Sequence, residues 1–312
     1  MSVRRLQLGI AWLAIILTAV SSLAFVGYSL ALFGGSLANG SNTFNTGTMA
    51  APTAPSANGS LATITLNWTA TSTPYATGTR VLRSSTSGGP YSQVGQVTPA
   101  GTTSYIDAPI SGTYYYVLRS YYQSWESANS SQVSAAASTQ TGYLDCSANA
   151  AVTSGSGDNN GYQTNPGNAC ANGSGNASDA SSGTGTSTSC TATGKDRHIF
   201  YDYGISIPTG STINGIEVRT DAWADSTSGI PRLCVQLSWN GGATWTTNQT
   251  APNLTTSETT NILGSTSDNW GRTWSATELN NTNFRVRITD VAASTARTFS
   301  LDWVSVQVTY TP

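Results

Sequence analysis

The stretch LATITLNW, residues 61–68, alternates polar or small side chains with apolar ones. Ile64, Leu66 and Trp68 recur at every second position, which is the period of a β-strand and not the 3.6-residue period of a helix. In an antiparallel sheet, one such set of side chains faces the core and the other faces water. The stretch therefore predicts a half-buried strand with Trp68 as a core anchor.

The same alternation recurs along the chain, and no stretch carries a helical apolar stripe. From residue 50 to 136, the alternating segments are LATITLNWTA, GTRVLRSS, YSQVGQV, TSYIDA and TYYYVLRSYY. After Cys190 they are RHIFYDYGISIP, TINGIEVRTDAWA, RLCVQLSW, NFRVRITDV and FSLDWVSVQVTY. Short strands between turn signals are typical of β-sandwiches, so we expect an all-β protein.

The last two of these segments also predict which side chains are buried. In NFRVRITDV, residues 283–291, Arg285 and Arg287 alternate with apolar neighbours and should face water. In SLDWVSVQVTY, residues 300–310, Asp302 falls in the apolar-facing register. An unpaired buried charge costs several kcal/mol, so we expect Asp302 to meet an ion or one of these two arginines.

The start of the chain predicts export. Arg4 and Arg5 precede an uncharged, mostly apolar stretch from residue 6 to 33, longer than the roughly 7–15 residues of a simple signal core. We assign residues 1–38 to a signal peptide or membrane anchor helix and residues 39–50 to a linker. Cleavage is the favoured outcome, although several small-residue triplets could serve as its site. Either outcome places the remaining chain outside the cell.

The amino-acid composition limits which classes of partner we expect the protein to bind. Only 9% of the residues are charged, against about 25% in an average chain. The net charge is −2 and Lys195 is the single lysine, so no basic stripe is evident that could neutralise phosphates. We therefore expect no nucleic acid as partner, and contact with a membrane only through the amino-terminal segment.

Four cysteines indicate disulfides. Cys146, Cys170, Cys190 and Cys234 form an even set in an exported chain, and none lies in a CxxC spacing. Two disulfides therefore rank above a structural zinc site. Sequence alone leaves three pairings open, of which we favour Cys146 with Cys170 and Cys190 with Cys234.

Residues 51–137 resemble a fibronectin type III domain. The resemblance rests on the entry APTAPSA (residues 51–57), on Trp68, on the segment at residues 78–95, and on SGTYYYVLRS (residues 111–120). In the last segment, Tyr114 fits the tyrosine corner of such sandwiches. The resemblance implies a seven-strand sandwich that acts as a spacer or adhesive unit, without catalysis.

Three aromatic residues follow the last long strand of this domain. Tyr121, Tyr122 and Trp125 could stack on sugar rings if they are exposed in a loop. Alternatively, they cover the edge of the sandwich, which is the more ordinary role of surface aromatics.

Residues 141–312 form the second predicted domain, which begins with a polar stretch from Cys146 to Cys190. The later segments ISIPTGSTINGIEVR (205–219) and FSLDWVSVQVTY (299–310) resemble strands of jelly-roll domains, many of them carbohydrate-binding-like. The resemblance implies a possible structural Ca²⁺ between an amino-terminal loop and an acid near the last strand. The matching positions are Asp158, Asn160 and Asp302.

No catalytic constellation is evident. SWNGGATW, residues 238–245, resembles an Asp-box hairpin, in which the glycines supply positive φ, and such a hairpin does not indicate a hydrolase. The acids Asp107, Glu126, Asp221, Asp225 and Glu278 are scattered singly, whereas a glycosidase needs a pair. His198 lacks a nucleophile elbow and is better interpreted as a strand-edge residue.

Residues 41–55, SNTFNTGTMAAPTAP, resemble the mature start of camelysin-type exported proteins, a group that includes biofilm fibre subunits. The resemblance implies possible self-assembly through a donated strand; a flexible linker is the alternative. Our leading hypothesis is a non-catalytic secreted or cell-surface protein that binds glycan or matrix through its C-terminal sandwich. A structural subunit of an extracellular fibre or coat comes second, and a hydrolase of unrecognised type third.

Overall fold

The computed structural model describes residues 47–312. The predicted signal or anchor at residues 1–38 lies outside the described residues. So do residues 39–46 of the predicted linker or donor strand at residues 39–50. Within residues 47–312, no helix is long and apolar enough to cross a membrane. The described part is built of β-strands, with one short 3₁₀ helix, η1 (Pro166–Ala169).

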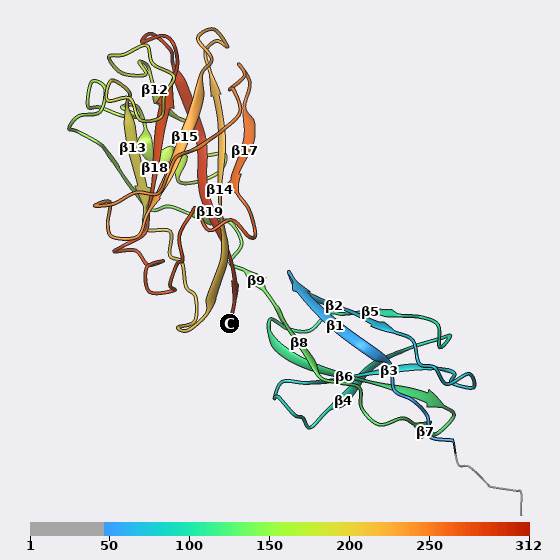
Figure 1. Ribbon diagram of the computed structural model, residues 1–312. Coiled ribbons are helices and arrows are strands. Elements are labelled where there is room, and N and C mark those ends of the chain that lie inside the picture. Colours follow the sequence, from blue (N-terminus) through green and yellow to red (C-terminus); the bar gives the residue numbers. More distant parts are fainter. Residues whose placement is uncertain (1–46) are drawn as a thin grey trace, which may run out of the picture. The chain divides into compact units, whose positions relative to one another are not determined.

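The first sandwich has two antiparallel sheets (Figure 1). Its strands are β1 (Thr53–Ser60), β2 (Thr63–Thr69), β3 (Gly78–Ser84), β4 (Ser92–Val97), β5 (Ser104–Asp107), β6 (Gly112–Tyr122), β7 (Trp125–Glu126) and β8 (Val133–Ala137). One sheet has the order β1-β2-β5 and the other β4-β3-β6, with β7 and β8 both paired to β6. This strand order is that of a fibronectin type III sandwich, as the sequence predicts.

The core of the first sandwich comes from the alternating residues of β2 and their partners in the other sheet. Ile64, Leu66 and Trp68 are buried, and they pack in one cluster with Val81 and Tyr116. The prediction that Trp68 anchors this core is confirmed.

Tyr116, and not Tyr114, links β6 to the end of β5. The buried hydroxyl of Tyr116 donates to Asp107 Oδ2 at 2.8 Å, and Arg83 donates to the same oxygen at 2.8 Å. Tyr114 lies instead under the Arg83 guanidinium, 4.9 Å from its ring centroid. The expectation for Tyr114 was wrong because β6 places Tyr116 on the core face, where its hydroxyl reaches the neighbouring sheet.

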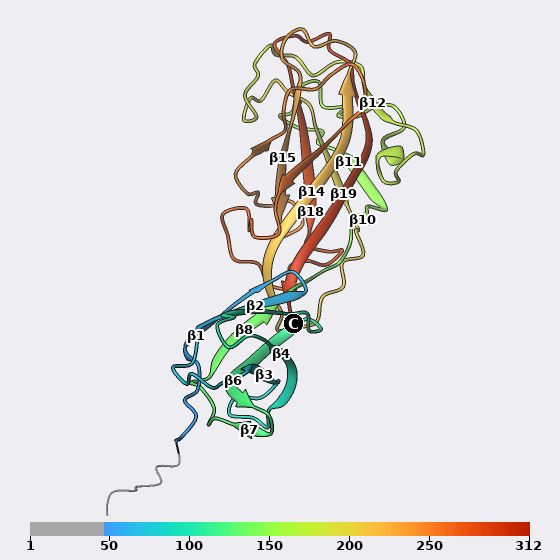
Figure 2. The same cartoon turned by 90° about the vertical axis from the view of Figure 1, so that its right-hand side faces the viewer.

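The second sandwich is of jelly-roll type. Its strands are β9 (Thr139–Gln140), β10 (Leu144–Asp145), β11 (Ala148–Ala151), β12 (Ala177–Asp179), β13 (Arg197–Tyr201), β14 (Thr212–Ala224), β15 (Arg232–Ser238), β16 (Gln249–Thr250), β17 (Thr259–Gly264), β18 (Arg285–Val291) and β19 (Phe299–Thr311). One sheet has the order β10-β19-β14-β17, with β9 and β12 also paired to β19; the other has the order β11-β13-β18-β15-β16. The principal strands from β13 to β19 thus alternate between the two sheets, and the long strands β14 and β19 run side by side (Figure 2).

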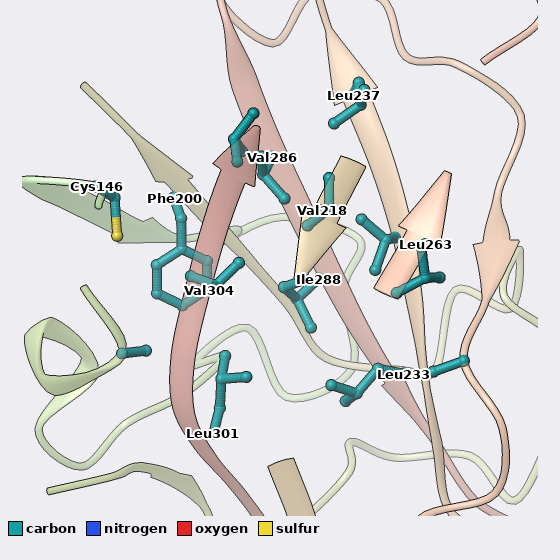
Figure 3. Close-up of a cluster of buried hydrophobic side chains, with 14 of the residues drawn as sticks. Cys146, Phe200, Val218, Leu233, Leu237, Leu263, Val286, Ile288, Leu301 and Val304 are labelled. Atoms are coloured by element: carbon teal, nitrogen blue, oxygen red, sulfur yellow. The ribbon is translucent and has the colours of Figure 1, made fainter. Parts of the chain in front are cut away.

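The core of this sandwich lies between the two sheets. Phe200, Val286 and Ile288 come from one sheet, and Val218 and Val304 from the other, all fully buried. Their side chains meet in the close-up of Figure 3. The alternation predicted for residues 283–291 is therefore confirmed, with Arg285 and Arg287 on the outer face.

A β-bulge in β19 removes Asp302 from the core. Asp221 pairs with Trp303, but the next residue of β14, Ala222, pairs with Leu301, so Asp302 is the extra residue. As a result Leu301 and Val304 both point into the core (Figure 3). The sequence prediction that Asp302 enters on the core-facing side was wrong, because a bulge shifts the two-residue alternation by one.

The long polar stretch is held by disulfides. Cys146 is bonded to Cys170 and Cys190 to Cys234, which is the favoured pairing. The segment also supplies short pairings, since Ala177–Asp179 forms β12 against β19. Its backbone polar groups thus find partners although the segment has few apolar side chains to bury.

Candidate ligand-binding site

The exposed aromatic residues lie on a tight hairpin of the first sandwich. β6 and β7 are joined by Gln123 and Ser124, and Tyr122 pairs directly with Trp125 across the hairpin. Gln123 adopts a left-handed conformation, φ 53°, which a two-residue hairpin loop requires. The hairpin therefore holds Tyr122 and Trp125 close together.

Both rings are open to solvent. The exposed fraction is 41% for Tyr122 and 61% for Trp125. Tyr75, also 41% exposed, meets Tyr122 edge-on with 6.1 Å between ring centroids. A hollow of about 220 Å³ is lined by Tyr122, Gln123, Ser124 and Trp125. We call Tyr75, Tyr122 and Trp125 the aromatic platform.

Tyr121 is not part of the platform. It is only 7% exposed, and the Arg80 guanidinium lies 4.9 Å from its ring centroid. Successive residues of β6 point to opposite sides, so Tyr122 is presented to solvent and Tyr121 is covered. The prediction that groups Tyr121 with the ligand-binding aromatics is corrected on this ground.

Ion pairs fix the base of the hairpin. Glu126 in β7 accepts a hydrogen bond from Arg119 at 2.7 Å and another from Arg80. The hydrogen bond from Arg119, followed by that from Arg80, holds the pKa of Glu126 below its ordinary value, against the effect of burial. Glu126 is thus a bridge between two arginines and keeps β7 on β6.

Aromatic rings of this kind suit sugars. The apolar C–H face of a sugar ring stacks on an exposed aromatic face, while nearby amides and hydroxyls bond its hydroxyl groups. The platform offers the rings, and Gln123 and Ser124 offer the polar atoms between them.

A larger hollow in the second sandwich offers no such surface. It measures about 350 Å³ and is lined mainly by small and hydroxyl side chains with Trp274. Trp274 is buried, and Arg272 lies 4.4 Å from its ring centroid and 4.1 Å from that of Trp239. Neither ring therefore presents an open face there.

The three residues predicted to hold calcium are divided between two places. Asp158 and Asn160 share one loop, where Asp158 Oδ1 accepts the Asn160 N–H at 3.2 Å. Asp302 Oδ2 accepts the Gly173 N–H at 3.1 Å instead. In the part of the chain from residue 47 to 312, no three acidic, histidine or cysteine side chains are arranged to hold a metal ion.

A buried polar cluster is the feature that sequence reasoning missed. Asp179, Lys195, Asp196 and Asp290 are all buried, and each of the three carboxylates leaves one oxygen without a hydrogen-bond partner. Lys195 Nζ donates to the Ala292 carbonyl at 2.7 Å. No local motif signals this cluster, because its members lie in β12, at the start of β13 and in β18.

Electrostatics favour neutral carboxyl groups in this cluster. Burial, reinforced by Asp179, raises the pKa of Asp290 well above its ordinary value. Burial likewise raises the pKa of Asp179. Burial and the charges of Asp179 and Asp158 raise the pKa of Asp196 to about 7. These groups are buried, and Asp196 Oδ1 accepts the Asp158 N–H of the long loop at 3.0 Å.

His198 is also structural. It lies in β13 between β11 and β18, and it is buried, so it is not the strand-edge residue that the sequence suggests. Its Nδ1 accepts the Tyr162 N–H at 3.1 Å, which leaves Nε2 to donate to Asn149 Oδ1 at 3.0 Å. Burial lowers the pKa of His198 to about 4, so the ring is neutral at pH 7.

The five scattered acids are each paired with arginine. The pairs are Asp107 with Arg83, Glu126 with Arg80 and Arg119, Asp221 with Arg219, Asp225 with Arg297, and Glu278 with Arg272. Asp221 also lies near other acids, because burial and then the charges of Asp302 and Asp221 raise the pKa of Glu258.

The Asp-box-like turn is held by its own side chains. Asn240 Oδ1 accepts the Thr244 N–H at 2.8 Å, and Gly241 and Gly242 have φ of 73° and 99°. The following strand, β16, begins only at Gln249, so the connection is longer than the tight hairpin expected from the sequence. Trp239 packs against the core, whereas Trp245 lies under Arg287.

Comparisons with known proteins find likenesses among solved structures only. No family model matches the sequence, and no curated protein matches it. An Fn3-like protein from Clostridium thermocellum is 32% identical over 28% of this chain and 92% of that chain, with a TM-score of 0.25.

Two further solved structures are more distant. One is a two-domain fibronectin type III segment from chicken tenascin, 11% identical over 78% of this chain and 92% of that chain, with a TM-score of 0.26. The other, described as CBM4 structure and function, is 17% identical over 36% of this chain and 72% of that chain, with a TM-score of 0.24. The fold of both sandwiches therefore rests on their own strand order and pairing.

Proposed function

We propose that the protein is a non-catalytic binding or adhesion protein that recognises glycan. The observation that carries this proposal is the aromatic platform, in which Tyr122 and Trp125 expose 41% and 61% of their surface around a hollow of about 220 Å³. The polar atoms of Gln123 and Ser124 lie between the rings and would orient a sugar.

The proposed location is the cell surface or the extracellular space. Two disulfides support it, because such bonds form and persist in oxidising compartments. A surface rich in hydroxyl and amide side chains, with few charges, also suits an exported protein.

A non-catalytic role is supported by the state of the ionisable groups. The scattered acids are paired with arginines, and the only histidine is buried and neutral. A hydrolase would have to use a group in another setting, and its turnover would then be lost when one carboxylate is changed to the amide.

The proposal is tested by measuring binding of the full chain to neutral polysaccharides: a β-glucan, a xylan and chitin. Trp125→Ala and Tyr122→Ala should each weaken binding about tenfold, since the loss of one stacked aromatic corresponds to roughly 1.4 kcal/mol. Ile106→Ala is the matched control, because Ile106 is 64% exposed on the same sandwich and lies outside the platform.

Two results would contradict the proposal. Binding that is unchanged in both aromatic variants would remove the platform as the site. An absence of saturable binding to every polysaccharide would remove glycan recognition itself.

A further inference from the structure

The arginines of the described residues fall into two groups. Six form ion pairs with carboxylates: Arg80, Arg83, Arg119, Arg219, Arg272 and Arg297. The other four arginines between residues 47 and 312 form no such pair: Arg197, Arg232, Arg285 and Arg287. The second group is not scattered, because all four lie in the sheet β13-β18-β15.

The strand register puts these four arginines on one face. Arg285 and Arg287 alternate with the core residues Val286 and Ile288, so they face outward. Arg197 lies opposite Thr289, and Arg232 lies opposite Val291. Residues 285, 287, 289 and 291 share one side of β18, so Arg197 and Arg232 point to the same outer side. We call these four residues the arginine face.

The guanidinium groups are oriented by neutral partners. Arg285 lies 4.5 Å from the ring centroid of Tyr201, and Arg287 lies 4.1 Å from that of Trp245. Arg287 Nε donates to Gln236 Oε1 at 3.1 Å. Stacking on an aromatic ring holds a guanidinium plane in place without neutralising its charge.

Backbone carbonyl groups accept hydrogen bonds from other N–H groups of the arginine face. Arg197 donates to the Ala192 carbonyl at 2.7 Å, and Arg232 donates to the Thr188 carbonyl at 3.2 Å. These two arginines thus also tie down the loop before β13. Arg285 Nη1 donates to the Asn281 carbonyl at 2.6 Å and to the Phe284 carbonyl at 2.8 Å, which leaves its Nε and Nη2 for a ligand.

Two of these charges lie close enough to affect each other. Burial, followed by the charge of Arg197, lowers the pKa of Arg287 to about 10, so Arg287 remains protonated at neutral pH. The outer face of the other sheet has the opposite character, since Glu217 and Asp221 lie there beside a single arginine, Arg219. An anion would therefore be directed to the arginine face and away from the opposite one.

We propose that the arginine face binds the carboxylate groups of an acidic polysaccharide, a chain of uronic-acid type. This inference rests on the proposed function, which it deepens by giving the second sandwich a ligand class. A guanidinium fork binds a carboxylate through two parallel hydrogen bonds, and stacking on Tyr201 orients Arg285 for such a pair. Nε and Nη2 of Arg287 already donate to Gln236 Oε1, so Arg287 contributes its charge and its remaining Nη1 donor.

The observations favour a polysaccharide over the other polyanions. Four arginines are fewer than the 6–10 phosphate contacts typical of a duplex-binding protein, and the net charge of −2 repels a polymer as densely charged as nucleic acid. A protein partner would need an apolar or aromatic centre, whereas the two rings of this face, Tyr201 and Trp245, are already stacked against guanidinium groups.

The test compares polygalacturonate with the same polymer in methyl-esterified form, using the full chain. Arg285→Gln should weaken binding to polygalacturonate about tenfold, and Arg285→Lys should weaken it less, because lysine keeps the charge and loses the fork. The methyl ester should not compete at this face, and added salt should weaken the binding.

Arg297→Gln is the matched control. It removes one arginine charge from the same sandwich, but Arg297 is paired with Asp225 and lies outside the arginine face. Its affinity for polygalacturonate should stay within about twofold of the wild type. Circular dichroism and the melting temperature of each variant show whether it remains folded.

Several outcomes would overturn the inference. Equal losses in Arg285→Gln and Arg297→Gln would show a general charge effect, and equally tight binding of an oligonucleotide would show the wrong ligand class. Salt-sensitive self-association that is lost in Arg285→Gln, without glycan binding, would make a second copy the occupant.

The same experiment separates this inference from the proposed function. Binding of neutral polysaccharide through Trp125, without binding of polygalacturonate, would overturn the arginine face and leave the aromatic platform in place. An absence of binding to both kinds of polymer would overturn both.

Discussion

Asp196 shows what a single residue contributes in this protein. Its carboxyl is buried at the start of β13, one oxygen accepts the Asp158 N–H at 3.0 Å, and the other has no partner. Lys195, Asp179 and Asp290 complete its charged surroundings. The carboxyl is therefore more stable when it is protonated.

The Asp196→Asn variant should lose less stability than the wild type as the pH rises. The folded-state pKa of Asp196 is about 7, above that of an unfolded aspartate, so the folded state binds more protons between the two values. Stability from this group is present at low pH and is lost as the pH rises through about 7. Between pH 5 and pH 8 the wild type should lose roughly 2–3 kcal/mol from this group, so its melting temperature should fall by roughly 5–10 °C more than that of the variant.

Melting followed by circular dichroism in excess chelator measures this difference. His198 acts in the opposite direction, since burial lowers its pKa to about 4 and its contribution is lost as the pH falls. Because His198 is present in both proteins, its effect cancels in the comparison. An identical pH profile in the two proteins would show that Asp196 is ionised in the folded state across this range.

At the scale of elements, the long polar loop between Cys146 and Cys190 depends on its covalent links. The cysteines of the two disulfides are 24 and 44 residues apart, so each bond closes a sizeable loop in the unfolded chain. The loop buries polar residues such as Ser156 and Ser182 and few apolar ones. Its stability therefore rests more on these links and on hydrogen bonds than on hydrophobic burial.

Cys190→Ser with Cys234→Ser should destabilise the second sandwich by about 4 kcal/mol, and Cys146→Ser with Cys170→Ser by about 3.5 kcal/mol, from loop-closure entropy. Urea unfolding of the two double variants, each against the wild type, measures both costs. The wild type treated with reductant is the control, since it should reproduce the combined loss. A cost below about 1 kcal/mol for either pair would show that the loop is held by its other contacts.

At the scale of the whole molecule, the placement of the acids leads to a prediction about calcium. Asp158 and Asn160 lie in one loop and Asp302 contacts Gly173, and none of the acidic groups between residues 47 and 312 is arranged to hold a metal ion. We therefore expect the melting temperature to be the same with calcium as with excess chelator. A bound ion at 100 times its dissociation constant would add about 2.7 kcal/mol, which a melting curve detects easily.

A rise of several degrees with calcium and not with magnesium would contradict this expectation. It would show that the cluster of Asp179, Asp196 and Asp290 rearranges around an ion, because each of these carboxylates has a free oxygen. Asp290→Asn would then abolish the rise, whereas Asp302→Asn would not.

The fold was largely predictable from sequence, because strand alternation is a local property. Trp68 and the residues of 283–291 are placed as their two-residue period predicts. The alternation failed at Asp302, where a bulge shifts the register, and at Tyr114, where Tyr116 takes the predicted role. Both failures depend on a neighbouring strand that the local pattern does not describe.

The candidate sites were predictable only in part. The sequence left open whether Tyr121, Tyr122 and Trp125 are exposed in a loop or cover the edge of the sandwich. It could not tell that Tyr122 and Trp125 are exposed while Tyr121 turns the other way. It identified no basic surface, because Arg197, Arg232 and Arg285 are far apart in the chain and meet only in one sheet.

The sequence by itself determined the all-β class, the strand positions and the polar character of the long loop, since all three follow from short-range patterns of side chains. Only the tertiary structure decided which charges meet. Between residues 47 and 312, six arginines form ion pairs with carboxylates and four do not. Three aspartates from separate segments lie together in one buried cluster. The physical reason is that a charge interacts through space over several ångströms, so its effect depends on the register and packing of strands that are distant in sequence.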